Sequence, residues 1–185
     1  GSRTGTSADY ATNGVHWFTG TNWTTYDRSN DPKYNALTNS TDVVNVIVDP
    51  KNSKHAFMGT WGSGLLEYAP GGIVRVYDTT NSTLQPLNVP GFHPLQVGGE
   101  AFDSQGNLWV ATCLNAKPLN RLSPDGTWLG FSMPSSMNSN FLYNLLIDVN
   151  NSCGYFEKSL EVMDEYTRFR QGLPPSENIY SEQQY

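Results

Sequence analysis

Short apolar runs separated by turn residues make up most of the first 150 residues. Runs such as VVNVIV at 43–48 and LWVA at 108–111 are bounded by Asp, Asn, Gly and Pro. Glycine supplies the positive φ angles of tight turns, and Asp, Asn and Pro set the ends of hairpins. The pattern predicts an all-β fold built from short antiparallel strands.

Two stretches of about 35 residues, at 43–77 and at 97–131, are similar to each other and form an internal repeat. The pairs lying 54 residues apart are Asp49 and Asp103, Tyr68 and Leu122, and Tyr77 and Phe131, while Phe57 falls near Trp109. The predicted strands are about 43–48, 55–60, 64–69 and 73–78 in the first copy and about 97–102, 108–113, 118–123 and 127–132 in the second. Four antiparallel strands repeated at this period predict the blades of a β-propeller.

Partial copies flank the two full ones. Residues 14–27 match strands three and four of a blade, and residues 144–150 match strand one. The prediction is therefore a section of a propeller, with about two full four-stranded blades and a partial blade at each end, in a longer or a truncated ring. An open arc exposes faces that neighbouring blades would cover, so we expect poor solubility or self-association.

The C-terminal segment has a different composition. Charged residues number 19 in positions 1–150 and 9 in the last 35 positions. From Ser159, near-helical apolar spacing followed by Gly172 and two prolines predicts a short helix, then a disordered end. This segment is either a genuine helical cap or foreign sequence from a frameshift or fusion. The expected division is a disordered 1–13, propeller blades over 14–156, and a tail over 157–185.

Charge and hydropathy exclude several classes of protein. The net charge is −6 and charged residues make up 15 % of the chain. An acidic chain with no basic patch lacks the positive surface that binds nucleic acid. No apolar run is long enough to span a membrane. We expect no signal peptide in the residues that follow Gly1, and the compartment is not readable from this end of the sequence.

Candidate catalytic and metal-binding motifs are absent from the sequence. No GxSxG motif occurs, and Ser63 lies in a predicted turn. The three histidines are isolated, without HExxH or His-x-His spacing, so we predict no metal, no cofactor and no catalytic residue. Asp49, Asp103 and Asp148 recur at the end of strand one, where we expect them to cap turns.

Two further features concern single residues. Cys113 and Cys153 could form a disulfide in an oxidising compartment, and the sequence leaves this open. Trp61 is placed at the joint between strands two and three, which opens on the same propeller face as the joint between strands four and one. The predicted ligand- or partner-binding rim consists of Trp61, Phe92, His93 and Lys117. In the alternative, Trp61 folds back over its blade and binds nothing.

Two segments carry a resemblance to a known family. DSQGNLWVAT followed by PLNRLSPDGTW resembles the two-component regulator propeller repeat, as does GTWGSGLLEY followed by VRVYD. Over about residues 14–151 the order of segments is similar to the propeller region of PorZ-like proteins of the Bacteroidetes type IX secretion system. The resemblance implies a non-catalytic binding or scaffold module at the cell surface or in the periplasm. Its expected partner is a protein of a secretion or sensor complex, or an oligosaccharide or lipopolysaccharide. The alternative is the glycan-sensing propeller section of a hybrid two-component receptor.

Overall fold

Antiparallel strands account for nearly all regular structure in the computed structural model, which describes residues 14–37, 42–88, 90–91, 94–133, 142 and 145–147. The elements are β1 (Val15–Phe18), β2 (Trp23–Tyr26), α1 (Pro32–Asn35), β3 (Val43–Asp49), β4 (Asn52–Gly62), β5 (Leu65–Ala69), β6 (Gly72–Tyr77), β7 (Leu95–Phe102), β8 (Leu108–Thr112), β9 (Leu119–Leu122) and β10 (Trp128–Phe131). The all-β prediction is confirmed.

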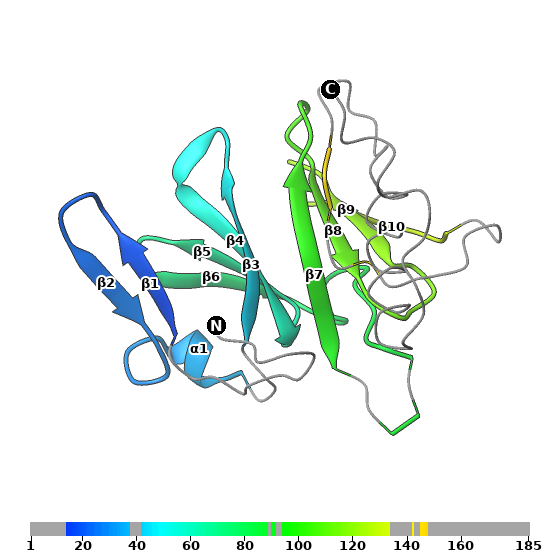
Figure 1. Ribbon diagram of the computed structural model, residues 1–185, viewed down its shortest axis with the longest axis horizontal. Coiled ribbons are helices and arrows are strands. Elements are labelled where there is room, and N and C mark those ends of the chain that lie inside the picture. Colours follow the sequence, from blue (N-terminus) through cyan, green and yellow to red (C-terminus); the bar gives the residue numbers. More distant parts are fainter. Residues whose placement is uncertain are drawn as a thin grey trace, which may run out of the picture.

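Two four-stranded units form the body of the molecule, and we call them the first blade (β3–β6) and the second blade (β7–β10) (Figure 1). Within each blade every strand pairs antiparallel with the next. The blades are joined by a short pairing of β4 with β7, where Trp61 lies opposite Gln96. The chain is thus a section of a β-propeller, as the repeat predicted.

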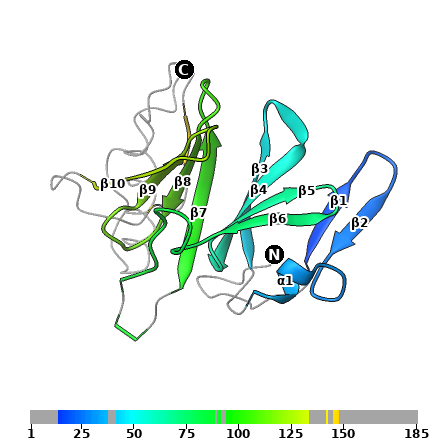
Figure 2. The ribbon, with the colours of Figure 1, turned by 180° about the vertical axis from the view of Figure 1, so that it is seen from behind.

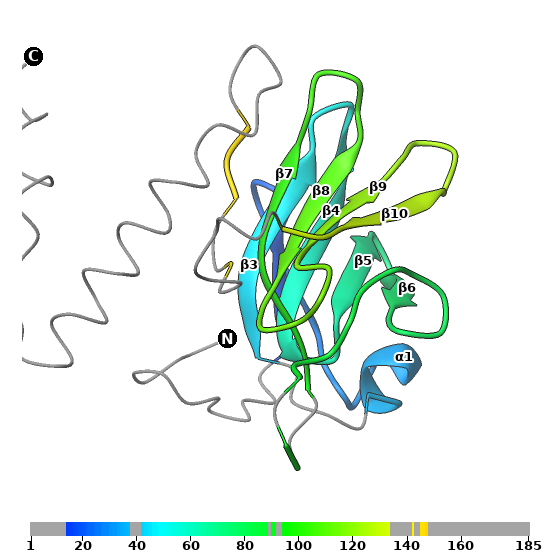
Figure 3. The same ribbon diagram turned by 90° about the vertical axis from the view of Figure 1, so that its right-hand side faces the viewer.

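The strand one-to-two turns of both blades lie side by side at one end of the molecule, which we call the upper end (Figure 3). In the first blade the Asp49 carboxylate accepts a hydrogen bond of 2.8 Å from the Lys51 N–H. In the second, Asp103 accepts from the N–H groups of Gln105 and Asn107, at 3.0 and 2.8 Å. The predicted capping role is confirmed for these two residues, and Asp148 lies outside the described residues.

Three apolar clusters follow the order of the blades. The central one lies between the two blades and combines Phe57 and Leu65 of the first with Val97 and Val110 of the second. Another joins the β1–β2 hairpin to the opposite face of the first blade. The third lies on the outer face of the second blade and includes Leu142 and Leu145. Successive faces are therefore covered one by one, as in stacked blades.

The β1–β2 hairpin repeats the geometry of β5–β6 (Figure 2). Gly14 and Gly64, each just before the first strand of its hairpin, have φ of +76° and +81°. A side-chain carbon at either glycine would collide with the carbonyl oxygen of the matching tyrosine, Tyr26 or Tyr77. The prediction that residues 14–27 correspond to strands three and four of a blade agrees with this equivalence.

Some boundaries differ from the prediction. Strand β4 runs from Asn52 to Gly62, longer at both ends than the expected 55–60, because the turn uses only Pro50 and Lys51 and because Trp61 and Gly62 pair with β7. The helix α1 was not predicted, although Asp31 accepts hydrogen bonds from Lys33 and Tyr34 as its N-cap. Residues 145–147 form no strand. The predicted tail helix, the N-terminal segment and Cys153 lie outside the described residues.

Candidate functional site: a polar cluster around His55

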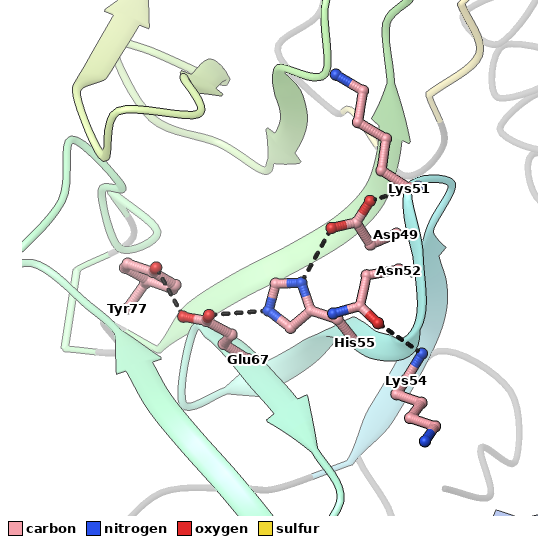
Figure 4. A network of polar contacts seen from close by, with 7 residues as sticks. All are labelled: Asp49, Lys51, Asn52, Lys54, His55, Glu67 and Tyr77. Atoms are coloured by element: carbon pink, nitrogen blue, oxygen red, sulfur yellow. Dashed lines mark hydrogen bonds and ion pairs between the residues drawn. The ribbon is translucent and has the colours of Figure 1, made fainter.

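A histidine held between two carboxylates is the densest group of titratable side chains in the described part of the chain (Figure 4). His55 Nδ1 lies 3.1 Å from Asp49 Oδ2, and His55 Nε2 lies 2.8 Å from Glu67 Oε1. The Tyr77 hydroxyl donates to the other oxygen of Glu67 at 2.8 Å. One residue from each strand of the first blade therefore meets here.

Strand geometry explains this meeting. His55 lies on β4 two residues before Phe57, so both side chains point to the same face of the sheet. Phe57 is directly opposite Glu67 on β5, which therefore shares that face. The face turns toward the second blade, where Phe102 packs edge-on against Phe57 with ring centroids 5.9 Å apart. The cluster lies near the upper end of the contact between the blades.

The surroundings favour the charged form of the imidazole. Partial burial lowers the pKa of His55, but the hydrogen bonds and negative charges of Asp49 and Glu67 raise it more, so the pKa lies above 6.5. Partial burial likewise raises the pKa of Asp49, and the Lys51 N–H and His55 more than offset it, leaving a lowered pKa. Burial, then the bond to Glu67, raises the pKa of Tyr77 to about 12.

The arrangement is suited to holding charge. Both ring nitrogens of His55 are already bonded, and the cluster in Figure 4 contains no Ser, Thr or Cys that the imidazole could activate. Among the residues that the structure describes, no group of three or more His, Cys, Asp or Glu is arranged to hold a metal ion. The hydrogen bonds and ion pairs of the cluster link β3, β4, β5 and β6.

The second blade has the same aspartate contact with a different partner. Trp109 Nε1–H donates to Asp103 Oδ2 at 2.9 Å, so a ring N–H six residues after the aspartate is the common feature. Arg121 takes the place of Glu67, and its guanidinium lies 5.8 Å from the Trp109 ring centroid. The sequence placed the aspartates correctly but gave no signal that His55 would join them.

The residues of the predicted rim are not gathered into one visible site. Trp61 belongs to β4 rather than to a joint and is only 6 % exposed. Lys117 is exposed in the β8–β9 connection, at the lower end of the second blade. Phe92 and His93 lie outside the described residues. The rim therefore stays a prediction.

An exposed aromatic pair was missed by the sequence reasoning. Phe18 and Trp23 face each other across the β1–β2 turn, with ring centroids 4.8 Å apart and exposures of 52 % and 68 %. The available signal was an aromatic residue on each side of the turn sequence TGTN at 19–22. Thr19 and Asn22 close the turn beside them.

Comparison with known proteins gives a match among solved structures. The chain matches no model of a protein family and no curated protein. PorZ, described as an essential bacterial surface component of the type-IX secretion system of Porphyromonas gingivalis, superposes with a TM-score of 0.60 and 28 % identity. The chain is similar to a PorZ-like propeller.

This similarity covers 74 % of the chain but only 18 % of PorZ, so the chain spans less than a fifth of that protein's length. The extracellular domain assigned to the hybrid two-component system BT4673 of B. thetaiotaomicron also matches, with a TM-score of 0.44, 19 % identity and coverage of 63 % of this chain and 14 % of that one. The match to PorZ confirms the resemblance stated from the repeats. No helix in the described ranges is long and apolar enough to cross a membrane.

Proposed function

We propose that the chain is a non-catalytic binding or scaffold module of the bacterial cell surface. The observation that carries this proposal is the match to PorZ, which covers 74 % of the chain at 28 % identity. The His55 cluster fits this proposal, because its imidazole is bonded to two carboxylates rather than to a hydroxyl or thiol that it could activate. The proposed contact surface is the predicted rim, of which Lys117 is exposed at the lower end of the second blade.

Binding to outer-membrane vesicles of a Bacteroidetes bacterium tests this proposal. We expect saturable binding that Lys117→Glu weakens about tenfold, whereas Lys54→Glu, a matched change of an exposed lysine at the upper end, leaves it unchanged. Equal losses in both variants would show charge-driven adsorption and contradict a rim site. Protease treatment of the vesicles separates a protein partner from a lipopolysaccharide. Release of sugar from a polysaccharide panel would overturn the non-catalytic assignment.

A second candidate is glycan sensing, favoured by the exposed Phe18–Trp23 pair. Flat aromatic faces bind the apolar faces of sugar rings, and hydroxyl and amide groups beside them provide hydrogen bonds. Trp23→Ala is expected to abolish binding to an oligosaccharide array. Val74→Ala, which shortens an exposed apolar side chain on β6, is the matched control. Array binding that survives Trp23→Ala excludes this hairpin as the glycan site.

A further inference from the structure

Glu100 is a buried acid between the two blades. It lies on β7, is 4 % exposed, and pairs across the sheet with Val110, whose side chain belongs to the central apolar cluster. Neither carboxyl oxygen is accessible to solvent, and neither makes a hydrogen bond of normal geometry with the described residues. A buried polar group in this state costs free energy and requires an explanation.

The repeat shows that an acid is unusual at this position. Val46 of the first blade lies 54 residues earlier, and Leu145 lies 45 residues later, in the segment that covers the second blade. Both of these residues are aliphatic. The contact between the first and second blades therefore carries a carboxyl where the repeat otherwise uses a side chain that needs no hydrogen bond.

The opposite strand makes room for this carboxyl. Gly59 on β4 faces Glu100, and a side-chain carbon at Gly59 would collide with Glu100 Oε1 and approach Val97. The corresponding residue of the second blade is Ala111. Ala111 pairs with Gly99 next to a bulge in β7, as Gly59 pairs with Asn45 next to a bulge in β3. The missing methyl group at Gly59 thus forms a niche for the acid.

Few groups near Glu100 can offset a charge. Asn45 of β3 and the apolar Val97 of its own strand are its neighbours, together with Gly59. The titratable groups that the structure describes on the same face of the first blade are Asp49, His55, Glu67 and Tyr77, which bind one another, and Phe57 separates His55 from Gly59 along β4. Burial, only partly offset by Asn45, raises the pKa of Glu100 to about 8.

We propose that Glu100 is a protonation switch that holds the two blades together as a neutral acid and loosens their contact when it ionises. The neutral carboxyl fits the niche beside Gly59 among apolar side chains. Loss of its proton to solvent leaves a carboxylate that has no cation beside it among the described residues. Hydration of that charge requires water to enter between β4 and β7, which pair in the described part of the chain through Trp61 with Gln96 and Gly62 with Leu95.

Hydrogen exchange of the β4 and β7 amides at pH 6 and pH 9 tests the switch. After correction for intrinsic exchange, protection at these strands is expected to fall at least tenfold in the wild-type chain and to stay within about twofold in Glu100→Gln. Protection of the β8–β9 pairing, away from the contact, is the internal control. An equal fall in wild type and Glu100→Gln would overturn the proposal.

A second variant and a direct titration of Glu100 test the proposal independently of Glu100→Gln. Glu100→Leu copies the residue found at Leu145 and should also remove the pH effect, whether or not Gln is accommodated. Carbon-13 NMR of the labelled glutamate carboxyls should show one of them titrating well above the others in the wild type and absent from Glu100→Gln. A Glu100 carboxyl that titrates with the exposed glutamates contradicts the proposal.

Discussion

At the scale of single residues, the same aspartate contact is built with a charged ring in one blade and a neutral ring in the other. Asp49 binds the imidazole of His55, and Asp103 binds the indole of Trp109. Partial burial raises the pKa of Asp103, yet its bonds to Asn107 and Trp109 lower it below the ordinary value. The two contacts should therefore differ in pH dependence, because only His55 changes charge near neutrality.

Replacement of His55 by Phe should cost about 1 kcal/mol of unfolding free energy at pH 5.5, from the loss of charge-assisted hydrogen bonds. The folded-state pKa of His55 is raised, so its contribution is fully present below pH 6.5 and is lost as the pH rises through the folded-state value. The difference between wild type and variant should accordingly shrink by pH 8.5. Urea unfolding at both pH values measures it.

Trp109→Phe is the matched control. It removes the Nε1–H bond to Asp103 but keeps an aromatic ring against Phe131, whose centroid lies 5.4 Å away. The cost should be about 1 kcal/mol at both pH values, because no group involved titrates between them. A pH-dependent loss in this variant would contradict the explanation given for His55.

At the scale of elements, the β5–β6 hairpin depends on two glycines whose roles differ. Gly64 has φ of +81° and packs against the Tyr77 carbonyl, whereas Gly71 has φ of +112° with nothing within 4 Å of an added side-chain carbon. Both substitutions by Ala should cost about 1 to 2 kcal/mol from the left-handed backbone. Gly64→Ala should cost roughly 2 kcal/mol more from the collision. Thermal unfolding of the two variants compares these costs, and equal values would refute the role of the close approach.

Strands and turns were predictable because their signals are local. Asp49 and Asp103 hydrogen-bond within a few residues of themselves, so the sequence alone located both turns. The His55–Glu67 bond depends on the register of β4 against β5, and the niche for Glu100 depends on Gly59, 41 residues away. Such pairings between distant residues are not readable from one sequence. Pairing with β7 also carried Trp61 into a strand rather than a joint.

At the scale of the whole molecule, the side of the first blade that faces the β1–β2 hairpin is only partly covered. Val46 and Val48 on β3 are 52 % and 50 % exposed. They pair with Met58 and Ala56, so all four side chains lie on the same face of the first blade. Met58 and Ala56 are buried there in the apolar cluster that includes the β1–β2 hairpin. Adjacent exposed valines on a strand with an open edge favour association between chains.

The double variant Val46→Thr/Val48→Thr should therefore reduce concentration-dependent self-association measured by sedimentation velocity. Threonine keeps the β-branched shape and strand propensity while adding a hydroxyl, so the fold should persist. Val74→Thr on β6, also exposed at 47 %, alters an equally apolar position on the outermost strand of the first blade and should have little effect. An equal reduction in both would assign the association to general surface hydropathy. A reduction confined to the β3 variant would locate the self-association at the face that carries Val46 and Val48. In a propeller, the inner strands of a preceding blade would pack against that face.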